Sequence, residues 1–177
     1  MLKNAGKQDN KKITVSEEPM SIEEQIRFHI KSKFSLAIHG KQGTLEKVLV
    51  HFPYHFMLEM NNEMKPEDII GQQHYDDNSH ESIMTPPNWY SEFCIYCKEY
   101  TKHDCVLLIH GITKCEPSKQ VLLNNLILER KLRVDHWPLP ANSSIILLVE
   151  NKEDANYIFY NITEQVFRRL EHIYLDN

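Results

Sequence analysis

Short apolar runs along the chain alternate with segments whose apolar residues recur at helical spacing. Five apolar runs predict strands, at residues 34–39, 56–60, 105–109, 144–150 and 172–175. Helical spacing and helix-start signals predict helices at residues 21–32, 44–51, 86–100, 117–129 and 162–170, and a short helical turn at 65–71. The runs at 105–109 and 144–150 are continuous, as in strands covered on both faces. Strands that alternate with helices predict an α/β fold with a mostly parallel sheet.

Start signals and polar segments set the expected boundaries of this fold. Ser21 followed by Glu24 forms a capping box that begins the first helix. The polar segment 72–85 is interpreted as a mobile loop, and the Trp-Pro-Leu-Pro sequence at 137–140 as a rigid connector. Residues 1–19 show no hydrophobic periodicity, so we expect a disordered or loosely packed tail, followed by a single domain over residues 20–177.

The composition limits the function classes that are plausible and does not alter the predicted fold. Of 177 residues, 41% are hydrophobic, which suffices for an ordinary packed core. The formal net charge of -5 provides no general attraction to nucleic acid or to an anionic membrane. No apolar run approaches the roughly 18 residues that cross a bilayer, and the polar N-terminus lacks the features of a signal peptide. We therefore expect a cytoplasmic protein with a protein partner and with no nucleic-acid or membrane partner.

Four cysteines lie close together in a chain without an export signal, which favours reduced thiols over disulfides. Cys94, Cys97, His103 and Cys105 fall within twelve residues of one another and leave a tetrahedral zinc site open as an alternative. Against it, Cys105 begins a predicted core strand, and the turn lacks the glycines of a zinc knuckle. Cys115 precedes a predicted helix but has no neighbouring base, so we predict no nucleophile there. The sequence favours buried free thiols and no bound metal.

Several local sequences, which together cover residues 34–176, resemble the MoxR-like and dynein-related branch of the AAA+ ATPases. They are residues 35–48 (SLAIHGKQGTLEKV), 66–71 (PEDIIG), 85–89 (TPPNW), 106–132 and 144–176. The resemblance implies a three-layer P-loop NTPase core with a five-stranded, mostly parallel sheet. The family's C-terminal helical lid is not expected, because the chain ends at Asn177.

The segment that resembles the family's phosphate loop departs from its motif, G-x-x-G-x-G-K-[ST], in which backbone amides and a lysine hold phosphates. Gly40 and Gly43 match the first two glycines, whereas Leu45 replaces the third glycine, Glu46 the lysine and Lys47 the hydroxyl residue. A carboxylate about 4 Å from a phosphate charge is repelled by roughly 4 kcal/mol at an effective dielectric constant near 20. ATP is therefore not expected as a cofactor.

The magnesium site implied by the resemblance is also altered. The family's strand ends in an Asp-Glu pair that holds magnesium and polarises the attacking water, and His110 and Gly111 stand at those positions. By contrast, Asn151 matches the polar residue that senses the terminal phosphate, and Arg169 matches the arginine finger. No paired carboxylates and no Ser-His-Asp order suggest another active site, so no catalytic residue is predicted.

The resemblance thus implies a degenerate nucleotide site, whose candidate residues are Gly40, Gly43, Thr44, Asn151 and Arg169. The leading hypothesis is a pseudo-ATPase that binds or scaffolds a protein, either an AAA+ ATPase or a second copy of the chain. The alternatives are a regulatory binder of a nucleotide or anion, and a subunit that donates Arg169 to an active AAA+ partner. The same residues also have simpler interpretations: glycines that allow a turn, an asparagine that caps a turn, and a surface arginine.

His39 and His110 each end a predicted strand at the carboxyl edge of the sheet, where ligands bind in open α/β folds. The predicted fourth strand separates their strands and carries Asn151 between them. A joint metal or anion site of the two histidines is therefore a minor alternative, and we expect each ring to be satisfied by local hydrogen bonds.

Overall fold

A five-stranded sheet in which every neighbouring pair of strands is parallel organises the structure, a computed structural model that describes residues 20–133, 136–152 and 158–175. The strand order is β2-β5-β8-β1-β9. The bounds are β1 Leu36–Gly40, β2 His55–Glu59, β5 Cys105–His110, β8 Ser143–Glu150 and β9 Glu171–Tyr174. The α/β fold predicted from the alternating pattern is confirmed, and this sheet is wholly parallel.

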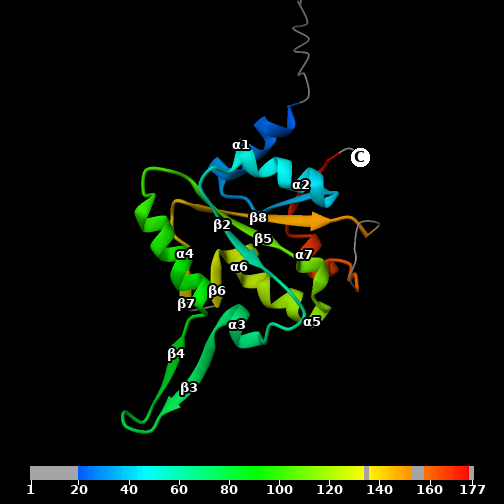
Figure 1. The fold of residues 1–177 in the computed structure, drawn as a ribbon. Coiled ribbons are helices and arrows are strands. Elements are labelled where there is room, and N and C mark those ends of the chain that lie inside the picture. The colour runs from blue at the N-terminus through cyan, green and yellow to red at the C-terminus, as the bar shows by residue number, and fades with distance from the viewer. Residues whose placement is uncertain (1–19, 134–135, 153–157, 176–177) are drawn as a thin grey trace, which may run out of the picture.

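Helices cover both faces of the sheet, because successive strand side chains point to opposite faces. One layer holds α1 (Ile22–Ser32) and α2 (Gln42–Val48), with Ile26 and Leu45 packed against Leu108 and Ile146. The other layer holds α3 (Pro66–Ile70), α4 (Asn88–Glu99), α5 (Pro117–Gln120), α6 (Asn124–Glu129) and α7 (Glu164–Phe167). Figure 1 shows these layers on either side of β8. All eight residues of β8 are buried, which explains the continuous apolar run.

The predicted capping box is present at the start of α1. The amide of Glu24 donates to the hydroxyl of Ser21, and the amide of Ser21 donates to the carboxylate of Glu24. None of the helices within the described residues is long and apolar enough to cross a membrane.

The prediction of a mobile loop at residues 72–85 is wrong. The segment forms an antiparallel hairpin of β3 (Gln72–Asp76) and β4 (Glu81–Thr85) that projects away from the sheet (Figure 1). The carboxylate of Asp76 accepts from the amide of Asn78 and the hydroxyl of Ser79, and His80 follows at φ +57°. Neither face of the hairpin is buried in the core, so the sequence shows no apolar alternation.

Other elements also differ from the prediction. The connector at 137–140 includes β7 (His136–Pro138), which pairs with β6 (Lys131–Arg133). The helix predicted from Pro117 is divided by a 3-10 turn at Val121–Leu123. The last helix is shorter than predicted, from Glu164 to Phe167, and the amide of its N-cap residue Thr163 donates to the buried side chain of Gln120.

Candidate functional site

The carboxyl edge of the sheet collects most of the residues that the sequence singles out, because all five strands end there. His39 and Gly40 end β1, His110 ends β5, and Asn151 follows β8. The amide of Asn151 donates to the carbonyl of Gly40 over 3.1 Å. Strand β8 lies between β1 and β5, so the two histidines belong to different halves of this edge. Each half has its own contacts.

The positions that resemble a phosphate loop are wound into helix α2. The helix begins at Gln42, directly after the N-cap residue Lys41, and the amides of Thr44 and Leu45 both donate to the carbonyl of Lys41 over 2.9 Å. A phosphate loop presents such amides to an anion instead. Gly43 is exposed, and a Cβ added there would meet no atom within 4 Å, so packing does not require a glycine at this position.

A network of charged side chains occupies the half of the edge formed by β2, β5 and β8. Nδ1 of His110 lies 2.8 Å from Oε2 of Glu59, and Nε2 lies 2.7 Å from Oε1 of Glu150. The ammonium of Lys114 lies 3.5 Å from Glu59 and 3.9 Å from Glu150. The side chain of Glu150 is only 5% exposed, and a buried carboxylate requires such partners. A ring N–H can donate to a carboxylate oxygen, so the imidazole of His110 bridges the two carboxylates.

Gly111 adopts a left-handed conformation, with φ +76°. A Cβ at this position would lie 2.3 Å from the carbonyl oxygen of Met60. That backbone is fixed in place, because the amide of Met60 donates to the carbonyl of His110 over 2.8 Å. The position that resembles the family's glutamate therefore excludes any side chain unless the backbone shifts.

A cavity of about 310 Å³ lies at the other half of the edge, with His39, Asn151 and Tyr174 among its lining residues. Nε2 of His172 donates to the carbonyl of Phe167, and Nδ1 of the same ring lies 2.8 Å from Nε2 of His39. The His39 ring stacks on Tyr174 with centroids 4.4 Å apart. Burial, with a smaller contribution from the charge of His172, lowers the pKa of His39 to about 4. Each histidine at the edge is thus satisfied by its own neighbours.

The remaining candidates lie on the outside of the fold. Thr44 is half-buried within α2, and Arg169 is exposed in the turn after α7, where its Nε donates to the carbonyl of Gln165 over 2.9 Å. Of the five candidate residues, Gly40 and Asn151 are joined by a hydrogen bond between their backbones.

The geometry around the cysteines does not support the zinc alternative. The described residues contain no group of three or more histidine, cysteine, aspartate or glutamate side chains placed to hold a metal ion. The ring of His103 instead stacks on Tyr54, with centroids 3.9 Å apart, and Cys97 and Cys105 are buried in the core. Burial raises the pKa of the Cys115 thiol to about 11.

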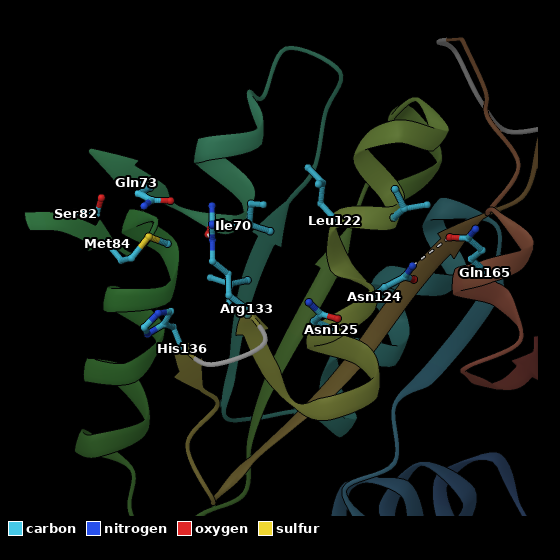
Figure 2. Close-up of a pocket in the computed structure, with 12 residues that line it drawn as sticks. Ile70, Gln73, Ser82, Met84, Leu122, Asn124, Asn125, Arg133, His136 and Gln165 are labelled. Carbon is cyan, nitrogen blue, oxygen red and sulfur yellow. Dashed lines mark hydrogen bonds between the residues drawn. The ribbon is translucent and has the colours of Figure 1, made fainter. Parts of the chain in front are cut away.

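Sequence reasoning missed a groove of about 860 Å³ on the face of the sheet opposite α1 and α2. Figure 2 shows Gln73, Ser82 and Met84 of the hairpin along one side, and Asn124 and Gln165 along the other. The guanidinium of Arg133 lies between them and donates to the carbonyls of Ile70 and Gly71. The sequence did not predict the groove, because one side of the groove is formed by the hairpin and the sequence predicted a polar loop for that segment.

Neither protein-family models nor curated protein sequences match this chain. Among solved structures, the chain is similar to a "putative ATPase" from Cytophaga hutchinsonii, with a TM-score of 0.57 and 15% sequence identity. The likeness covers 86% of this chain and 44% of that one, so this chain spans less than half of that protein's length. At this identity the likeness concerns the fold alone. The chain therefore shares with that structure a three-layer α/β fold around a five-stranded parallel sheet, an architecture consistent with a P-loop NTPase core.

Proposed function

We propose that this chain is a pseudo-ATPase, an AAA+-like core that neither hydrolyses nor binds magnesium-ATP and that serves as a protein-binding or scaffolding module. The observation that carries the proposal is the contact of His110 with Glu59 and Glu150. Side chains of the chain itself, those of His110 and Lys114, contact these carboxylates at the place where the resemblance puts a magnesium ion.

Two further features of the same edge support the proposal. The amides of Thr44 and Leu45 are used within α2, so they are not directed at an anion. Gly111 excludes a glutamate side chain, which removes the group that would polarise an attacking water. In addition, Glu46 lines a small cavity beside His110 and adds negative charge where a polyphosphate would lie.

Calorimetric titration with magnesium-ATP, together with a phosphate-release assay, tests the proposal. We expect no binding heat and no turnover above the buffer background. Any turnover should be unchanged in the His110→Ala and Arg169→Ala variants, because a contaminating ATPase does not respond to them. Turnover that either substitution abolishes would show that the chain itself is an enzyme.

The alternative of a regulatory anion binder predicts a different response. A nucleotide or phosphate held by Gly40, Gly43 and Thr44 would raise the melting temperature of the protein without magnesium. The pseudo-ATPase proposal expects no such rise for any member of a nucleotide panel. A saturable rise that disappears in a Thr44→Ala variant would favour the anion binder.

The exposure of Arg169 favours a second candidate function, donation of this arginine to the ATP site of an active AAA+ partner. The neighbouring Arg168 is exposed as well but forms an ion pair with Glu164, so it provides a matched control. If the second candidate function is correct, Arg169→Ala lowers the ATP turnover of the partner but does not prevent the two proteins from assembling. Arg168→Ala leaves both the turnover and the assembly unchanged. Equal turnover with both variants would rule out this candidate.

A further inference from the structure

The groove and the β3–β4 hairpin form one continuous surface. Gln73 pairs with Met84 and Tyr75 pairs with Ser82, so these four side chains share one face of the hairpin. Gln73, Met84 and Ser82 line the groove, and Tyr75 continues the same face outward with 58% of its surface exposed. The surface thus runs from the groove along the hairpin toward its tip.

Most residues of the hairpin are exposed to solvent. Residues 72–75 and 77–83 are all exposed, and neither strand pairs with another strand within the described part of the chain. An isolated two-stranded hairpin is marginally stable in water at best. Tyr75 on one face and Ile83 on the other, the latter 40% exposed, would gain from being covered by a partner.

The two ends of this surface carry opposite charge. The tip of the hairpin carries Asp76, Asp77 and Glu81. Arg133 and His136 line the groove, and its lining residues within the described chain include no aspartate or glutamate. Two carbonyls hold the guanidinium of Arg133 in place without neutralising it. An acidic projection beside a basic groove is complementary to a copy of itself.

We propose that the chain forms a two-fold symmetric dimer in which the hairpin of each copy lies in the groove of the other. A two-fold axis between the hairpins places each acidic tip against the other copy's basic groove and covers both Tyr75 rings. This inference rests on the proposed protein-binding function and specifies its partner as a second copy of the chain.

Sedimentation velocity over a wide range of protein concentration tests the inference on the full chain. We expect a reversible dimer for the wild type. Asp77→Lys combined with Glu81→Lys should raise the dimer dissociation constant on the order of a hundred-fold, because each substitution acts at two symmetric contacts. Asp76 is left intact because it caps the turn. The control, Glu92→Lys with Glu99→Lys, makes the same charge change on exposed positions of α4 and should have no effect.

Charge exchange separates a docking contact from a folding defect. His136→Glu, at an exposed position of β7, should weaken the dimer on the order of ten-fold, and adding Asp77→Lys and Glu81→Lys should restore part of the loss. Restoration supports the inference even if the tip variant alone melts early. Two results would overturn the inference: a wild type that is monomeric at every protein concentration, or a dimer whose dissociation constant is unchanged by the tip and groove substitutions. Dimer formation is measured without nucleotide. If the protein is monomeric and also does not bind magnesium-ATP, the dimer is ruled out while the pseudo-ATPase proposal is retained.

Discussion

Nε2 of His110 lies 2.7 Å from Oε1 of Glu150, a carboxylate that the central strand buries at the carboxyl edge of the sheet. The contact places a nitrogen base where the resemblance to AAA+ ATPases calls for a metal-binding aspartate. The same contact therefore affects the stability of the fold and occupies the position of a catalytic residue, and each effect can be measured.

Removing the imidazole should destabilise the protein. His110→Ala removes the imidazole that lies 2.7 Å from the buried carboxylate of Glu150, and we expect the free energy of unfolding to fall by about 3 kcal/mol. Glu59→Gln, on the exposed side of the same ring, should cost less than about 1 kcal/mol. Urea denaturation at neutral pH gives both values. Equal losses for the two variants would mean that the burial of Glu150 is not the cause.

Two glycines should respond in opposite ways to alanine. Gly111→Ala puts a Cβ 2.3 Å from the carbonyl of Met60 at a positive φ, so we expect a loss of more than about 2 kcal/mol. Gly43→Ala lies in open space within α2 and should stabilise the protein by up to about 1 kcal/mol. The same denaturation curves measure both. A destabilising Gly43→Ala would indicate that this glycine has a role beyond the helix.

Acid should weaken the fold through His39. Its pKa is about 4 in the folded protein, below the ordinary value of 6.5, so the unfolded chain binds the proton more tightly. The stability from this group is complete above pH 6.5, falls as pH drops from 6.5 toward 4, and changes no further below that. For a half-buried ring we expect a total loss on the order of 2 kcal/mol.

The His39→Gln variant isolates this effect, because a glutamine amide can still donate to His172 but does not titrate. Burial also lowers the pKa of His29, so the difference between wild type and variant, measured by urea denaturation across this pH range, is the relevant quantity. A difference that does not vary with pH would contradict the assignment to His39.

Thiol reactivity should follow burial. Cys94 is half-buried and should react first with a disulfide reagent, whereas Cys97, Cys105 and Cys115 should react slowly in the folded protein. Burial raises the pKa of each of these three thiols, that of Cys115 to about 11, which suppresses the reactive thiolate. Peptide mass spectrometry after timed labelling gives the order, and urea-unfolded protein, in which all four react quickly, is the control. Rapid labelling of Cys115 in the folded state would contradict this prediction and support Cys115 as a candidate nucleophile.

The α/β fold with a parallel sheet could be predicted from the sequence, but the geometry of the candidate site could be predicted only in part. The resemblance indicated that His110 and Gly111 replace the magnesium-site pair and that β8 separates His39 from His110, and the strand order agrees. It did not indicate that α2 begins at Gln42, because glycines in the segment suggested a turn there. The hairpin and the groove were missed, since exposed strands lack the apolar alternation that reveals buried ones.

By itself, the sequence determined the α/β layering, because apolar runs such as residues 144–150 and the capping box of Ser21 and Glu24 act within a few residues of one another. The tertiary structure alone decided which groups meet. His110 contacts Glu59 and Glu150, which lie 51 and 40 positions away along the chain, and His39 contacts His172 at a separation of 133. Such contacts depend on strand order and register, and local patterns of apolar and polar residues do not record either.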